Sequence, residues 1–213
     1  MVMPKVKVCG ITRKEDALAA VAAGCDALGF LFYKKSPRCI SLAAARAIIK
    51  ALPKRIITIG VFVNAPAGRV KRVAGACGLG ILQFHGEESP AFCRLFKKYK
   101  IIKTFRIKEK IDFQQVARYD VWAYLFDTWA KGARGGTGKQ FNWKVLATPA
   151  SQALRRPVFL SGGLKCGNVR RALACAHPAW VDVSSGVESA PGKKDHGKVK
   201  RFIAAVKGKG GSR

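Results

Sequence analysis

Eight short apolar runs, each separated from the next by a segment with helical periodicity, constrain the fold of this 213-residue chain more than any other feature. The runs are rich in β-branched residues and cover residues 6–9, 27–32, 56–63, 81–84, 101–105, 121–126, 158–160 and 180–183. They recur about every 25 residues, which is room for one strand, one helix and two loops. Runs that are apolar throughout are typical of strands in a parallel sheet that is covered on both faces.

The intervening segments begin with residues that favour helix starts. Thr12 and Glu15 have the spacing of a capping box, and Gly24 is the expected stop of that helix. Four polar residues are expected to open later helices in the same way: Ser41, Ser89, Asn142 and Asn168.

Eight alternating units in a chain of this length predict an α/β protein with the single-domain (β/α)8 TIM barrel fold. An open doubly wound sheet is the structural alternative. The sequence Cys-Gly-Ile-Thr at residues 9–12, after the first run, does not match the glycine fingerprint of a nucleotide-binding sheet. Since no linker composition interrupts the chain, we expect one catalytic barrel over residues 1–206 and a flexible basic tail over residues 207–213.

The composition excludes several classes of protein. No apolar run reaches the ~18 residues of a membrane-spanning helix, and the Lys-containing N-terminus does not resemble a secretory signal. The seven Cys are odd in number and form no C-x-x-C pair, and only three His accompany them. A disulfide framework and a structural zinc site are therefore not expected. These features favour a cytoplasmic protein that makes no membrane contact.

The chain is strongly basic, with 40 Lys plus Arg against 12 Asp plus Glu and a formal net charge of +28. Residues 94–110 and 193–213 are dense basic patches with eight cations each. No zinc finger, RNP motif or basic-zipper heptad accompanies them. Solvated helix faces are therefore the favoured interpretation, and a polyanion-binding surface is the alternative. With nucleic acid we expect nonspecific electrostatic contact at most.

Candidate site residues lie where the barrel rule places an active site, at the C-terminal ends of the strands. Ser161-Gly162-Gly163 follows the seventh run and Ser184-Ser185-Gly186 follows the eighth. Glycine lets backbone N–H groups approach an anion, and these two loops are the usual phosphate site of such barrels. Tight turns alone would also explain the glycines, but two such loops at these two positions favour phosphate.

The chain resembles the phosphoribosylanthranilate isomerase family over about residues 5–206. The resemblance rests on nine segments in order: KVCGIT at 7–12, GFLF at 29–32, SPR at 36–38, QFHGEE at 83–88, DT at 127–128, GGTGK at 135–139, SGGL at 161–164, DVSSGVE at 182–188 and PGKKD at 191–195. Asn142 replaces a common Asp, and Cys39 stands where an aromatic residue is more usual. The resemblance implies rearrangement of N-(5-phosphoribosyl)anthranilate to 1-(2-carboxyphenylamino)-1-deoxyribulose 5-phosphate in tryptophan biosynthesis. It implies no metal, nucleotide or other cofactor.

The resemblance also implies that Cys9 is the general base and Asp127 the general acid. The barrel model agrees, because strands one and six lie on opposite sides of the mouth and their ends could flank a sugar. A free thiol is mostly protonated at neutral pH, so we expect nearby positive charge to assist Cys9 as a base. Lys7, two residues earlier on the same strand, is expected to point the same way. The alternatives are a buried apolar role for Cys9 and a cap or turn role for Asp127.

The substrate is expected to be a small phosphosugar, and Arg38 is the candidate to bind its anthranilate carboxylate, because a guanidinium forms two parallel hydrogen bonds with a carboxylate. The alternative for Arg38 is one more exposed cation. Asp182 is expected to point into the barrel and to orient substrate hydroxyls or satisfy backbone groups. His85 is expected to fill the barrel rim or form hydrogen bonds there and not to act in catalysis. The remaining expected substrate contacts are Gly136, Gly162, Gly163, Ser185 and Gly186.

Three alternatives to this interpretation stay open from the sequence. An indole-glycerol-phosphate synthase and a pentose-phosphate epimerase are rival phosphosugar barrels, although three His are few for a metal-dependent epimerase. A polyanion binder that has kept the barrel is a rival of a different class. The protein is expected to act as a monomer or a homodimer.

Overall fold

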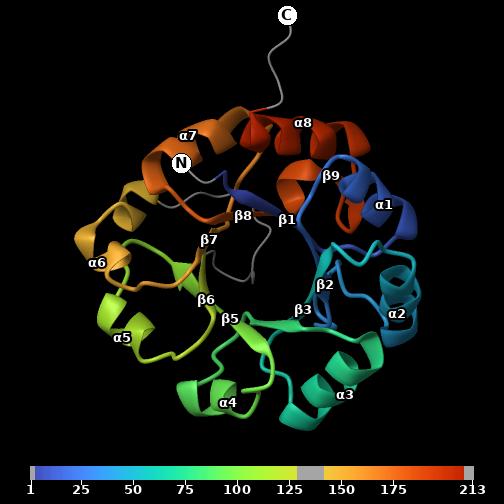
Figure 1. Ribbon diagram of the computed structural model, residues 1–213, viewed down its shortest axis with the longest axis horizontal. Helices are drawn as coiled ribbons and strands as arrows, with labels where there is room; N and C mark the ends of the chain where they lie inside the picture. Colours follow the sequence, from blue (N-terminus) through green and yellow to red (C-terminus); the bar gives the residue numbers. More distant parts are fainter. Residues whose placement is uncertain (1–2, 129–141, 209–213) are drawn as a thin grey trace, which may run out of the picture.

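The chain folds into a closed barrel of eight parallel strands, in a computed structural model that describes residues 3–128 and 142–208 (Figure 1). The strands are β1 (Lys5–Cys9), β2 (Ala27–Leu31), β3 (Ile57–Phe62), β4 (Ile81–Phe84), β5 (Lys100–Ile107), β6 (Ala123–Thr128), β7 (Val158–Leu160) and β8 (Trp180–Val183). β1 pairs with β8 and closes the ring, with Lys7 beside Asp182. The predicted (β/α)8 barrel is confirmed.

The helices surround this ring (Figure 1). They are α1 (Lys14–Ala22), α2 (Leu42–Lys50), α3 (Ala67–Cys77), α4 (Pro90–Arg94), α5 (Phe113–Ala117), α6 (Pro149–Gln152), α7 (Cys166–Ala176) and α8 (His196–Lys207), with 3-10 helices η1 (Trp143–Leu146) and η2 (Ser185–Val187). A short antiparallel pair, β9 (Glu188–Ala190) and β10 (Lys193–Lys194), lies between β8 and α8.

Inward-facing side chains fill the barrel in two layers of different chemistry. The layer nearer the N-terminal strand ends is apolar and consists of Ala27, Ile59, Ile81, Ile102, Ala123, Leu125, Phe159 and Trp180. Successive inward positions along a strand are two residues apart. The next inward positions are polar and buried on several strands: Gln83, Thr104, Asp127, Ser161 and Asp182. Buried polar groups need partners, so this upper layer must pair internally or face a ligand.

The strands start and end within two residues of the positions predicted from the sequence. The difference that affects the site is in β6, which was expected at residues 121–126 and spans Ala123–Thr128. β6 extends to Thr128 because its partner β5 continues to Ile107, and Arg106 of β5 pairs with Asp127 of β6. Asp127 is therefore the penultimate residue of the strand and not the residue after it. Trp122 precedes β6, and its ring centroid lies 6.0 Å from that of Phe159.

The predicted helix starts are partly confirmed. Three of the expected caps accept a hydrogen bond from the first turn: Ser41, Ser89 and Asn142. The predicted capping box of Thr12 and Glu15 is wrong. The cap position of α1 is Arg13, which makes no side-chain cap bond, whereas the Thr12 hydroxyl donates to the carbonyl of Gly192. Thr12 thus ties the loop after β1 to the loop after β8.

The start predicted for α7 is also wrong, since the helix begins at Cys166. Asn168 lies inside its first turn and accepts the Lys165 N–H at 2.8 Å. At the other end of the chain, α8 includes Lys207, the first residue of the expected tail, whose Nζ lies 2.7 Å from Asp26 Oδ2. Residues 209–213 lie outside the described residues, so the tail stays a prediction. In the two described stretches, no helix is both long and apolar enough to cross a membrane.

Candidate active site

Lys7 lies inside the barrel with no exposed surface, and its charge is paired with Asp182. The Lys7 Nζ to Asp182 Oδ1 distance is 2.8 Å, across the seam between β1 and β8. The second carboxylate oxygen, Asp182 Oδ2, accepts the Ser161 hydroxyl at 3.3 Å. Asp182 therefore points into the barrel as predicted. A buried ammonium is tolerated only with such a partner.

Cys9 is the last residue of β1, and its side chain lies near that of Lys7. A Cβ atom at Gly29 on β2 would lie 2.8 Å from Cys9 Sγ and 3.0 Å from Lys7 Nζ, so the absence of a side chain at Gly29 makes room for both. This arrangement confirms that Lys7 points to the same side as Cys9.

The expected assistance of Cys9 by nearby positive charge is present, but burial has the larger effect on its pKa. Burial raises the pKa of the Cys9 thiol above its ordinary value, and the positive charge of Lys7 offsets only part of that rise. The negative charge of Asp182 adds to it. For Lys7, burial lowers the pKa, but Asp182 and Cys9 raise it by more, so its pKa lies above the ordinary value. The resting pair is therefore a thiol beside an ammonium.

Asp127 is buried at the C-terminal end of β6, against His85. Its Oδ2 lies 3.2 Å from His85 Nε2, although the two groups are not aligned as a hydrogen bond. Asp127 Oδ1 accepts the backbone N–H of Thr128 at 2.8 Å. On the other side of the imidazole, His85 Nδ1 lies 3.0 Å from Gln83 Nε2. His85 therefore contacts the candidate acid directly, a role that sequence reasoning missed although both residues occupy inward positions at strand ends.

Cys9 and Asp127 border the same mouth but do not face each other across it. β6 is separated from β1 by β7 and β8 around the closed ring, whereas β5 is opposite β1. The expected placement on opposite sides is therefore wrong by one strand. Ser161 and Asp182, from the two intervening strands, occupy the wall between them.

Both glycine loops require glycine, the loop after β7 for its backbone conformation and both loops for lack of space. Gly162 and Gly163 have φ angles of +90° and +63°. A Cβ atom at Gly162 would overlap the Thr128 side chain, and one at Gly186 would overlap the carbonyl oxygen of Leu164. The loop after β7 can therefore approach the end of β6, and the loop after β8 can approach the loop after β7, only with glycine at these positions. Ser185 and Gly186 lie in η2, and Gly136 lies outside the described residues.

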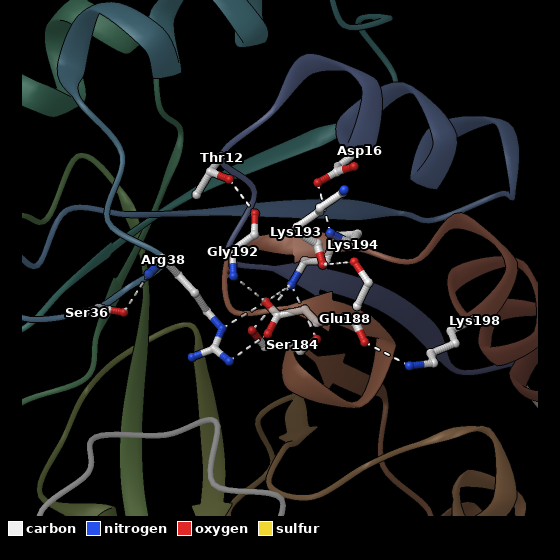
Figure 2. Close-up of polar contacts among 11 residues, drawn as sticks. Thr12, Asp16, Ser36, Arg38, Ser184, Glu188, Gly192, Lys193, Lys194 and Lys198 are labelled. Carbon is white, nitrogen blue, oxygen red and sulfur yellow. Dashed lines mark hydrogen bonds and ion pairs between the residues drawn. The ribbon is translucent and has the colours of Figure 1, made fainter.

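Arg38 is not an exposed cation, because only 12% of its side chain is exposed. Its Nε and Nη2 atoms donate to the two carboxylate oxygens of Glu188 at 2.9 and 2.7 Å. Lys194 joins the same carboxylate, with Nζ 2.8 Å from Glu188 Oε1 (Figure 2). Sequence reasoning missed Glu188 and Lys194 as site residues, although both belong to the motifs after the eighth strand.

Comparison with known proteins agrees with this geometry. The family model described as N-(5'phosphoribosyl)anthranilate (PRA) isomerase matches residues 6–205. The chain belongs to this isomerase family. An N-(5'-phosphoribosyl)anthranilate isomerase of Pelobacter propionicus is 48% identical over 205 residues, which are 96% of each chain. The match decides against the two rival phosphosugar families.

Solved structures of the phosphoribosylanthranilate isomerase family share the fold. The enzyme from Thermotoga maritima is 42% identical, with a TM-score of 0.90 over 97% of this chain and all of its own. A second structure, 40% identical with a TM-score of 0.87, covers 97% of this chain and 100% of its own. It is a complex with reduced 1-(o-carboxyphenylamino)-1-deoxyribulose 5-phosphate.

The pKa directions of this isomerase predict opposite effects of two neutralising substitutions on Cys9. Lys7→Met removes the cation that lowers the thiol pKa, so the pKa should rise further and the thiolate should form only at higher pH. Asp182→Asn removes an anion that raises it, so thiolate formation should move to lower pH. The measurement is the pH dependence of Cys9 alkylation by iodoacetamide, followed by peptide mass spectrometry.

The exposed Cys166 is the internal control in the same digests, because its alkylation profile should be the same in all three proteins. Circular dichroism checks that both variants are folded. Shifts of Cys9 in the same direction, or no shift in either variant, would contradict the proposed electrostatic coupling.

Proposed function

We propose that this chain catalyses the rearrangement of N-(5-phosphoribosyl)anthranilate to 1-(2-carboxyphenylamino)-1-deoxyribulose 5-phosphate in tryptophan biosynthesis, by general acid–base catalysis without a metal. The observation that carries the proposal is one barrel mouth that combines a buried carboxyl group, a thiol beside a lysine, and two glycine loops. These are Asp127 on β6, Cys9 on β1, and the loops after β7 and β8. The proposal includes a cytoplasmic enzyme that is a monomer or a homodimer.

Ring opening is assigned to Asp127. In its protonated form it donates a proton to the furanose oxygen while the bond between C1 and that oxygen breaks, and the anilino nitrogen forms a Schiff base with C1. The position of Asp127 supports this role, because its carboxyl group is buried at the mouth of the barrel, where it is shielded from bulk water. Its contact with His85 holds the carboxyl group at the end of the strand.

Removal of the C2 proton is assigned to Cys9. The thiolate takes this proton, the electron pair forms the C1–C2 double bond, and the C=N electrons neutralise the nitrogen. The enolamine then gains a proton at C1 and loses one from the C2 hydroxyl to give the ketone. Burial that raises the pKa of Cys9 lowers the thiolate population but makes each thiolate a stronger base. Lys7 stabilises that thiolate.

Binding is assigned to groups around this pair. Arg38 binds the anthranilate carboxylate, and the phosphate contacts Gly162, Gly163, Ser185 and Gly186, with Gly136 expected to join them. Among the described residues, each carboxylate oxygen of Asp182 accepts one hydrogen bond. Since a carboxylate oxygen has two lone pairs, each oxygen can accept one more hydrogen bond, from a substrate hydroxyl.

The acid–base assignment predicts that Cys9→Ala and Asp127→Asn each lower kcat by roughly 10²–10⁴, the usual contribution of a positioned acid or base. KM should change little, because neither residue binds the phosphate or the carboxylate. The assay is the decay of substrate fluorescence with purified protein in EDTA. Wild-type activity that disappears in EDTA would contradict the metal-free mechanism. Near-full kcat in either variant, with chemistry rate-limiting, would remove that residue from its role.

The phosphate site predicts that inorganic phosphate competes with substrate and that Gly163→Ala raises KM. A methyl group at a φ of +63° strains the loop and blocks approach of its backbone to the anion. Gly78→Ala is the matched control, because Gly78 has a φ of +62° and open space around it at the end of α3. It should cost similar stability and leave KM unchanged. Equal KM effects of the two substitutions would argue against a phosphate site at Gly163.

A further inference from the structure

Glu188 is the centre of a buried charge cluster at the rim of the barrel, with 5% of its side chain exposed (Figure 2). Its Oε1 accepts hydrogen bonds from Arg38 Nε at 2.9 Å, from Lys194 Nζ at 2.8 Å and from the Gly192 N–H at 3.4 Å. Its Oε2 accepts from Arg38 Nη2 at 2.7 Å. The Glu188 backbone carbonyl also accepts from Lys198 Nζ at 2.9 Å. This carboxylate is therefore fixed from several directions.

Glu188 uses only one edge of the Arg38 guanidinium. The group has five N–H donors, and the bonds to Glu188 take the Nε hydrogen and one Nη2 hydrogen. Within residues 3–128 and 142–208, no partner takes the second Nη2 hydrogen or either Nη1 hydrogen. Nη1 and Nη2 together present two parallel N–H groups on the edge away from Glu188, which is the geometry that a second carboxylate accepts.

The aliphatic part of the Arg38 side chain, its stem, is also held in place. A Cβ atom at Gly10 would lie 2.8 Å from Arg38 Cδ and 3.1 Å from Ser184 Oγ, so the stem packs directly on the backbone after Cys9. With the stem on Gly10 and one edge on Glu188, the guanidinium has little rotational freedom. Its free edge is therefore preorganised beside the end of β1.

The charges of the cluster leave one positive charge to be neutralised. Lys194 has no exposed side-chain surface, and burial lowers its pKa by more than Glu188 raises it. As an ammonium paired with Glu188 it contributes one positive charge alongside that of Arg38. Burial raises the pKa of Glu188, but Arg38 and Lys194 lower it by more, so its pKa lies below the ordinary value and the group is ionised. The Glu188 carboxylate and the two cations that contact it directly, Arg38 and Lys194, give a net +1. Lys198, on the Glu188 backbone carbonyl, is not part of this sum. A substrate carboxylate bound to Arg38 would bring that sum to zero.

We propose that Glu188 is the positioning residue for Arg38, and that its two hydrogen bonds aim the free guanidinium edge at the carboxylate of the substrate. Glu188 thereby sets the preference of the site for an aromatic ring that carries a carboxylate over the same ring without one. This inference rests on the proposed function, in which Arg38 binds that carboxylate.

Two ligands separate this positioning role from a structural one. One is reduced 1-(o-carboxyphenylamino)-1-deoxyribulose 5-phosphate, and the other is the same compound without the carboxyl group. Glu188→Gln keeps the shape but has one acceptor oxygen instead of two, and its amide N–H groups oppose the Arg38 and Lys194 donors. This substitution should raise the dissociation constant of the first ligand by on the order of tenfold or more and leave that of the second unchanged.

Glu15→Gln is the matched control, since it makes the same chemical change at an exposed carboxylate paired with Arg13. It should change neither dissociation constant. In turnover, Glu188→Gln should raise KM more than it lowers kcat. Equal weakening of both ligands, or no weakening of either, would overturn the positioning role.

Two further variants keep the test decisive. If Glu188→Gln shows no thermal unfolding transition, Glu188→Asp replaces it in the test. Glu188→Asp keeps the charge but places it one methylene further from Arg38. It should therefore lose less affinity than Glu188→Gln, and only for the ligand that carries the carboxylate. Arg38→Met separates the two proposals. If wild type shows neither turnover nor preference for the carboxylate ligand, the proposed function fails. If Arg38→Met abolishes the preference and Glu188→Gln keeps it, only the role of Glu188 fails.

Discussion

The ion pair between Lys7 and Asp182 is the interaction on which the chemistry of this barrel depends. The layer below it shows that apolar side chains alone can fill the interior, so the pair is not needed to close the ring. Replacing a buried ion pair by apolar residues of similar volume is often neutral or stabilising, whereas removing one partner costs about 3–5 kcal/mol. That loss is a large share of the roughly 5–15 kcal/mol that stabilises a typical domain. The pair is therefore best explained by what it does to its neighbour, Cys9.

Cys9 is influenced by one lysine from each of two charge clusters, and both lysines lower its pKa. Lys7 lowers its pKa from inside the barrel, and Lys194, held by Glu188 at the rim, lowers it from outside. Burial outweighs both and keeps the resting group a thiol. The same burial makes electrostatic contacts stronger than in water, so a thiolate formed during the reaction is stabilised by fixed cations and not by solvent. Glycine at positions 10 and 29 provides the space in which these clusters meet.

The sequence predicted what depends on local pattern and missed what depends on pairing across the ring. Apolar runs defined the strands because the parallel sheet is covered on both sides, and the Ser41 and Ser89 caps were correct because they act within one turn. The Thr12 hydroxyl does not cap a helix but donates a hydrogen bond to the Gly192 carbonyl, 180 residues away. Glu188 meets Arg38 from 150 residues away, and no periodicity encodes which of many cations a given carboxylate will bind.

A crystal structure of this chain with reduced 1-(o-carboxyphenylamino)-1-deoxyribulose 5-phosphate tests the account most directly. We expect the carbon chain of the ligand to lie between Cys9 Sγ and the Asp127 carboxyl group. Its phosphate should accept backbone N–H groups of the loops after β7 and β8, and its carboxylate should contact the free edge of Arg38. A ligand whose C1 and C2 atoms lie out of reach of both Cys9 and Asp127 would contradict the account.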